Sequence, residues 1–225
     1  MASDLESQIR AAERACLDSW GKGPSRLRWS EVPLQVGDLA PNFELPDSSG
    51  NLVNLNSFWS DRPALLLFWR HYGCGCGIDR ASRLQKEYEN YVSAGANIVI
   101  IGQGEPERAT AYAAKYNLPP VPILSDLKLQ VYSAYGLLEG KTSQIVFDAP
   151  DEFLRRDYEA FAGLAKARRE AGRPLVDNPW QLPGEFVIDT EGIVRLAYRY
   201  QYCEDWPNPL VLVAAIKESV WENQQ

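Results

Sequence analysis

The sequence predicts an α/β protein in which helices flank a central mixed β-sheet, and three observations support this class. Two dense apolar runs, residues 64–69 and 97–102, are typical of strands that are buried on both faces. Each run is followed by a segment with helical periodicity, so strands and helices alternate. Two apolar segments on either side of residues 190–192 have the pattern of an antiparallel hairpin, which makes the predicted sheet mixed.

The chain is expected to begin with a helix, because apolar residues from Leu5 to Trp20 recur at spacings of three and four up to the breakers at residues 21–24. A hairpin is predicted over residues 37–59, with its turn at 47–50. The remaining strands are expected at residues 64–69, 97–102, 122–124, 185–189 and 193–200, and the helices at 79–94, 105–117, 125–136 and 209–221.

Residues 1–36 are therefore interpreted as an N-terminal helical extension, and residues 37–225 as a single domain with an insertion at about 137–182. The insertion contains a charged, helix-prone segment, residues 151–171, between proline and glycine breakers. This segment has too little apolar pattern to fold alone. We expect it to pack against the sheet and to turn its charged face to solvent.

The composition excludes several functional classes. The chain has 225 residues and a formal net charge of −7, which argues against nucleic acid and against an anionic membrane surface as partners. No apolar run reaches the roughly 18–20 residues of a transmembrane helix, and no secretory signal is visible at the N-terminus. Four cysteines are too few and too unevenly placed for a disulfide framework, so a cytoplasmic location is predicted.

Cys74 and Cys76 lie among three glycines, at the junction between the first apolar strand and the following helix. The N–H groups and the positive dipole end at the start of a helix favour a thiolate over a thiol. The turn is therefore predicted to be a redox site. In that role one thiolate attacks a disulfide or a peroxide oxygen, and the other resolves the product.

Two other interpretations of the cysteine pair remain open. As a metal site, His71, Cys74 and Cys76 would offer three ligands, with Cys203 as a fourth. As packing groups, the thiols would only fill the turn of an interaction module on the same fold, without catalytic activity. The surrounding glycines leave the thiols accessible, and this favours redox chemistry.

Two neighbouring side chains are further candidates. His71, the only histidine of the chain, could stabilise a thiolate or relay a proton, or it could be a hydrogen-bonded residue at the strand end. Arg70 could supply a thiolate-stabilising positive charge, or it could be an ordinary surface cation.

Three motifs resemble those of peroxiredoxin-like proteins of the AhpC/TSA superfamily, which have a thioredoxin-like fold. The resemblance covers about residues 37–221. It rests on GDLAPNF at residues 37–43, FWRHYGC at 68–74 and PGEFVID at 183–189. The second motif is similar to the FWRHFGCxxC run of one peroxiredoxin-like group. In the third, Pro183 matches the cis-proline that packs beside the active-site thiol in thioredoxin-like folds.

The resemblance implies a thiol-dependent oxidoreductase or peroxidase that reduces hydroperoxides or disulfides. Its electrons would come from a thioredoxin- or glutathione-like donor, with no organic cofactor and no metal. A homodimer is compatible with the resemblance.

The chain departs from the family pattern at two places. On ungapped alignment Gly77 occupies the place of the second cysteine, and Pro183 occupies that of the arginine in true peroxiredoxins. Cys74 is the first choice for the nucleophile, and Cys76 is the second choice. Cys203 is a candidate resolving thiol.

Overall fold

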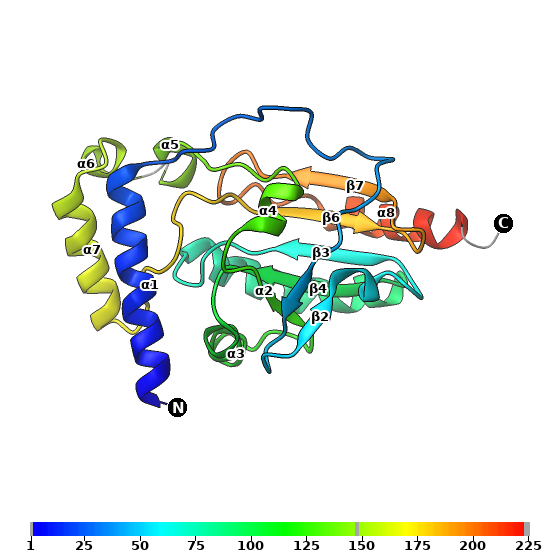
Figure 1. The fold of residues 1–225 in the computed structure, drawn as a ribbon, viewed down its shortest axis with the longest axis horizontal. Coiled ribbons are helices and arrows are strands. Elements are labelled where there is room, and N and C mark those ends of the chain that lie inside the picture. Colours follow the sequence, from blue (N-terminus) through cyan, green and yellow to red (C-terminus); the bar gives the residue numbers. More distant parts are fainter. Residues whose placement is uncertain (1, 147–148, 223–225) are drawn as a thin grey trace.

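The computed structural model describes residues 2–146 and 149–222, and its centre is a five-stranded β-sheet (Figure 1). The sheet has the strand order β5–β4–β3–β6–β7. Its strands are β3 (Ala64–Phe68), β4 (Asn97–Gly102), β5 (Ile123–Ser125), β6 (Gly184–Ile188) and β7 (Val194–Arg199). The first three are parallel, whereas β6 is antiparallel to both β3 and β7. The mixed α/β class predicted from the sequence is confirmed.

Both faces of the sheet are covered because successive side chains of a strand point to opposite faces. Leu65 and Leu67 of β3 share one buried cluster with residues of α2, α3 and α8. Leu66 and Phe68 share a second cluster with residues of α4 and of the N-terminal hairpin. These helices are α2 (Gly75–Ser93), α3 (Pro106–Lys115), α4 (Gln130–Ala134) and α8 (Pro209–Glu222).

The predicted N-terminal hairpin is present. It consists of β1 (Glu44–Pro46) and β2 (Leu52–Asn54), which pair antiparallel, and a short 3₁₀ helix, η1 (Leu55–Phe58), follows. The Asp47 carboxylate accepts the backbone N–H groups of Ser49 at 2.8 Å and Asn51 at 2.9 Å. This side-chain-to-backbone bonding is the chemistry that makes aspartate a turn residue.

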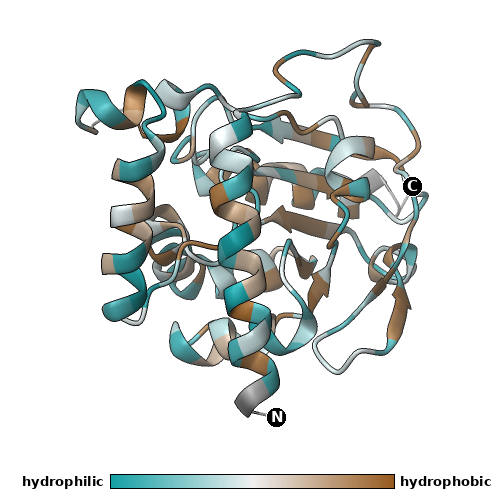
Figure 2. Cartoon of the chain, turned by 60° about the vertical axis from the view of Figure 1, so that its left-hand side comes forward, coloured by the Kyte–Doolittle hydropathy of each residue, from teal (hydrophilic) through white to brown (hydrophobic). Residues whose placement is uncertain are grey.

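The N-terminal helix and the insertion form a separate layer at one end of the sheet (Figure 1). The helices of this layer are α1 (Ala2–Lys22), α5 (Thr142–Ile145), α6 (Asp151–Leu154) and α7 (Tyr158–Glu170). The insertion contacts the sheet core through Leu137, but its helix α7 packs against α1 and not against the sheet as expected. The physical reason is that each helix carries a narrow apolar stripe, visible as brown bands in Figure 2, and the two stripes bury each other.

Aromatic stacking holds this layer together. Trp20 of α1 is fully buried and stacks on Phe161 of α7, with ring centroids 4.1 Å apart, and on Trp180, at 4.7 Å. Cys16, Ala165 and Leu175 complete the cluster. Cys16, which lies on the apolar stripe of α1, is therefore part of an apolar core.

Replacing Trp20 with alanine is expected to lower the free energy of unfolding by about 3–5 kcal/mol, because a large buried ring is lost and its cavity does not close fully. Urea denaturation monitored by circular dichroism measures the change. Trp29→Ala is the matched control, since that ring is 47% exposed, and its effect should be smaller. Equal losses in the two variants would contradict the assignment of Trp20 as the centre of this layer.

In the described part of the chain, no helix has both the length and the apolar character needed to cross a membrane.

Candidate functional site

The cysteine pair lies at the turn between β3 and α2. Trp69 continues the β3 pairing by donating its N–H to the Ile101 carbonyl at 2.8 Å, and the chain then turns at His71–Gly73. A side chain at Gly73 would place its Cβ only 2.1 Å from the Pro174 carbonyl oxygen, so the turn requires glycine here. The N–H of Cys74 donates to the His71 carbonyl at 3.1 Å, which fixes the cysteine at the end of the turn.

Helix α2 begins at Gly75, four residues earlier than the sequence indicated. Cys74 is its N-cap residue, in an extended conformation, and Cys76 lies in the first helical turn. This early start was not predicted, because Gly75 and Gly77 have a low intrinsic helix propensity. The tertiary reason for Gly77 is close packing, because a Cβ there would lie 2.9 Å from the Tyr112 hydroxyl.

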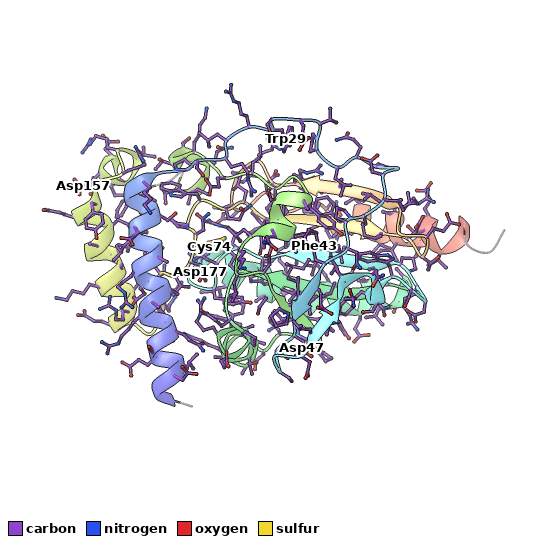
Figure 3. The ribbon with its side chains drawn as sticks, viewed as in Figure 1. Trp29, Phe43, Asp47, Cys74, Asp157 and Asp177 are labelled. Atoms are coloured by element: carbon purple, nitrogen blue, oxygen red, sulfur yellow. A yellow bond between two sulfur atoms is a disulfide. The ribbon has the colours of Figure 1, made fainter. Side chains whose placement is uncertain are left out.

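Cys74 and Cys76 are joined by a disulfide, with their Cα atoms 5.3 Å apart. The two sulfurs differ in accessibility. Cys76 is only 5% exposed, whereas Cys74 is partly exposed. Figure 3 places Cys74 where the sheet meets the layer of α1 and α7. A molecule arriving from solvent therefore meets Cys74 before Cys76.

Arg70 supplies a buried positive charge to this pair. Its Nη1 lies 3.4 Å from the Cys74 sulfur and 4.0 Å from the Cys76 sulfur, and its Nη2 donates to the Pro179 carbonyl. The residue is 4% exposed. Burial lowers the pKa of Arg70, but a guanidinium titrates so far above neutral pH that it remains charged. Either sulfur therefore faces a fixed cation when it is a thiolate.

His71 is buried beside the same turn. Burial, with the charges of Arg70, Arg168 and Arg108, holds the pKa of His71 well below its ordinary value. Its Nδ1 has no hydrogen-bond partner within residues 2–146 and 149–222. The neutral imidazole adds no positive charge to the thiol site, so that charge comes from Arg70.

Cys203 lies beside Arg70 and Cys76, although it is more than a hundred residues away in sequence. Cys203 and Cys76 both line a narrow cavity of about 20 Å³, to which Arg70 and Pro183 also contribute. The Cys203 sulfur contacts the Ile145 carbonyl at 3.5 Å. Burial raises the pKa of Cys203, and the Arg70 guanidinium opposes that rise.

Cys16 lies on α1, in the aromatic cluster with Trp20. It is 1% exposed, burial strongly raises its pKa, and Arg70 again opposes the rise. The positive charge of Arg70 therefore acts on the disulfide pair at close range and also influences the two free cysteines. This arrangement could not be predicted from the sequence, because it depends on how α1 and the C-terminal loop pack.

The structure corrects one expectation about Pro183. The residue lines the cavity beside Cys76, as its match to the thioredoxin-like proline predicts. However, the peptide bond before it is trans, and no cis peptide bond occurs in the described ranges. The sequence motif alone does not determine whether the bond before Pro183 is cis or trans. The trans form is the more stable one for most X–Pro bonds.

A buried ionic network behind the cavity was missed from the sequence. Arg80 of α2 pairs with Glu185 of β6 at 2.9 Å and with Glu87 at 3.1 Å, and the Tyr200 hydroxyl donates to Glu185 at 2.6 Å. Arg80 and Glu185 also line the cavity. The available signal was Glu185 itself, since a charged residue inside a continuously apolar strand needs a buried partner.

The donor set for the alternative metal site is not assembled. Across the residues that the structure describes, no three His, Cys, Asp or Glu side chains are grouped so that they could hold one ion. The cysteine pair is a disulfide and the buried cation Arg70 lies against it, which is unfavourable for a bound metal cation.

Residues 36–197 match the model of the AhpC/TSA family. The chain is 32% identical over 105 residues to peroxiredoxin Bcp of Escherichia coli, covering 47% of this chain and 66% of that protein. It is 33% identical over 172 residues to chloroplastic peroxiredoxin Q of Triticum aestivum, covering 75% of this chain and 61% of that protein. Each match spans slightly less than two thirds of the relative.

The fold is also similar to that of a solved structure, peroxidoxin BcpB from Mycobacterium tuberculosis. The superposition has a TM-score of 0.55 and covers 83% of this chain and 98% of that chain, at 18% sequence identity. At this identity the likeness supports the fold alone. It agrees with the thioredoxin-like architecture expected from the three sequence motifs.

Proposed function

The chain belongs to the AhpC/TSA family, and from this membership we propose that it is a thiol peroxidase or oxidoreductase acting through Cys74 and Cys76. Its proposed substrates are hydroperoxides or disulfides. The observation that carries the proposal is the buried Arg70 guanidinium, 3.4 Å from one sulfur and 4.0 Å from the other sulfur of a disulfide pair. A pair that serves only in packing has no use for a buried cation at this place.

In the reduced protein, two features lower the free energy of a Cys74 thiolate. One is the Coulomb attraction of Arg70, which acts in a poorly solvated environment. The other is the N-terminus of α2, whose unpaired N–H groups and dipole favour negative charge at its cap residue. We therefore propose Cys74 as the attacking sulfur, with Arg70 as its stabilising cation.

The proposed reaction has three balanced steps. The Cys74 thiolate attacks an oxygen of the hydroperoxide, the O–O bond breaks, and the departing alkoxide takes a proton and leaves as alcohol. Cys74 is then a sulfenic acid, which the Cys76 thiol attacks with loss of water to form the disulfide. Two thiols of an external donor reduce that disulfide by exchange and become a disulfide themselves.

The partly exposed Cys74 sulfur is the proposed point of attack for the donor. A thioredoxin- or glutathione-like thiol fits this step, and a reducing compartment such as the cytoplasm would supply it. All site residues come from one chain, so the chemistry is compatible with a monomer and with a homodimer. We assign it to the domain of residues 37–225, with residues 1–36 as an extension.

Cys203 is proposed as an internal resolving thiol for Cys76, because the two share one cavity beside Arg70. In a Cys74→Ser variant, one equivalent of diamide, a reagent that oxidises pairs of thiols to disulfides, is expected to form a disulfide between Cys76 and Cys203. Peptide mapping under non-reducing conditions would detect the link. Cys16 is the internal control and should remain alkylatable after denaturation.

If Cys76 forms only intermolecular disulfides and Cys203 stays free, the resolving role of Cys203 is contradicted. That outcome would leave the Cys74–Cys76 assignment intact, because the variant lacks this pair.

A further inference from the structure

A second cavity lies between α1, α3 and the C-terminal end of α7. Its volume is about 140 Å³, and the active-site turn contributes Tyr72 and Gly73 to its lining, but no cysteine does. The lining includes four cations and no carboxylate, in a chain with a net charge of −7. The cations are Arg108, Lys115, Arg168 and Arg173.

One of these cations is neutralised and three are not. Arg108 pairs with Asp177 at 2.6 Å and with Glu105. By contrast, the described part of the chain shows no ion pair for Lys115, Arg168 or Arg173. Burial, followed by the like charge of Arg173, lowers the pKa of Arg168. Arg168 and Arg173 therefore repel each other, and neither forms an ion pair within the described residues.

Helix termini account for part of this arrangement. Lys115 donates to the Gly172 carbonyl at 2.5 Å, and Arg168 donates to the carbonyls of Gly73 at 2.5 Å and Arg173 at 3.1 Å. Cations are favourable near the carbonyls at helix C-termini. Stabilisation of helix ends does not account for the Nε atom of Arg173. This atom is buried and has no hydrogen-bond partner among the described residues.

The remaining walls are apolar and aromatic. The rings of Tyr72 and Tyr112 stack with centroids 4.7 Å apart, and Tyr116 lies 4.7 Å from Tyr112. Leu5 and Ile9 of α1 also line the cavity. A dry cavity of about 150 Å³ is large enough for a benzene molecule.

We propose that this cavity binds a small organic carboxylate whose apolar body is about the size of a benzene ring. The carboxylate would accept hydrogen bonds from Lys115, Arg168 and Arg173, since guanidinium and carboxylate match in shape and charge. The apolar body would lie against the tyrosine row. The site is separate from the cysteine pair, and it does not depend on the proposed redox function.

The test uses benzoate as the probe, with benzyl alcohol as a neutral control of similar shape and sulfate as an anion without an apolar body. Isothermal titration of the full-length protein is expected to show saturable benzoate binding with a Kd of about 1 mM. Binding of either control compound should be at least about tenfold weaker, since each lacks one half of the recognition.

Variants distinguish the site from general charge effects. Lys115→Gln and Arg173→Gln should each weaken benzoate binding about fivefold to tenfold, and Ala111→Trp should block the cavity without removing charge. Lys86→Gln is the matched control, because this exposed lysine of α2 lies outside the lining. Urea denaturation confirms that each variant is folded.

Four outcomes would overturn the proposal. Absence of saturable benzoate binding would mean that the cations serve only the helix ends. If benzyl alcohol binds as tightly as benzoate, the negative charge is not recognised. If sulfate binds as tightly as benzoate, the apolar body is not recognised. An equal loss of affinity in the Lys86 variant would show that net charge, and not this cavity, attracts the anion.

Discussion

Replacing Cys74 with serine is expected to reduce peroxide-dependent oxidation of a thiol donor by at least about a thousandfold, because a serine hydroxyl is not ionised at neutral pH and cannot form a sulfenic acid. Replacing both Cys74 and Cys76 should abolish turnover. Cys76→Ser alone should slow turnover, because the Cys74 sulfenic acid then lacks its neighbouring thiol and is reduced only by thiols of the donor. Loss of donor thiol per equivalent of peroxide, measured with a thiol reagent, distinguishes the three variants.

Cys16→Ala is the matched control, since this buried cysteine of the aromatic cluster lies on α1 and is outside the proposed chemistry. The folded Cys16→Ala variant should have the same turnover as the wild type. A double variant of Cys74 and Cys76 with wild-type turnover would show that the redox assignment is wrong. Activity retained by Cys74→Ser and lost in Cys76→Ser would instead make Cys76 the attacking sulfur.

Removal of the Arg70 charge should have the second largest effect. In Arg70→Met, the pKa of the attacking thiol is expected to rise by about 1–3 units, because an opposite charge at this distance favours the ionised form by that much. A raised thiol pKa means that the thiolate persists only at higher pH. The rate at neutral pH should fall by up to about 1000-fold, and part of it should return as the pH increases.

The pH dependence of alkylation by iodoacetamide, followed on the reduced protein, measures this thiol pKa directly. The wild-type midpoint should lie below about 8.5, the value of an unperturbed cysteine, and that of Arg70→Met should lie above the wild-type value. Arg70→Lys should fall between the two, since it restores charge without the planar guanidinium. Equal midpoints for wild type and Arg70→Met would contradict the role given to Arg70.

The central sheet was predictable because its strands carry patterns that depend only on local sequence. The residues of β3 are all buried, and this produces the uninterrupted apolar run from Ala64 to Phe68. The start of α2 was not predictable in the same way. Gly75 and Gly77 disfavour a helix locally, and the packing of Tyr112 against Gly77 overrides that preference.

The chemistry of the turn was only partly visible in the sequence. The spacing of Cys74 and Cys76 indicated a redox pair, and their disulfide agrees with that interpretation. The direction of the Arg70 side chain was not visible, since it depends on the Pro179 carbonyl, which accepts its hydrogen bond from more than a hundred residues away. The approach of Cys203 has the same origin in tertiary packing.

The position of the insertion shows the limit of helical periodicity. The helix-prone segment predicted at residues 151–171 forms two helices, α6 and α7, and the apolar stripe of α7 could have faced either the sheet or another helix. The partner is α1, whose Trp20 stacks on Phe161 of α7 and on Trp180. Such a choice depends on side chains brought together by the fold.

One measurement tests the redox role of the pair most directly. The fully reduced protein is treated with one equivalent of hydrogen peroxide, its free thiols are alkylated, and its cysteine peptides are mapped by mass spectrometry. The proposed function predicts that Cys74 and Cys76 become a disulfide while Cys16 remains reduced. If Cys74 and Cys76 are both still alkylated as free thiols after the treatment, or if Cys16 is oxidised first, the proposed function is contradicted.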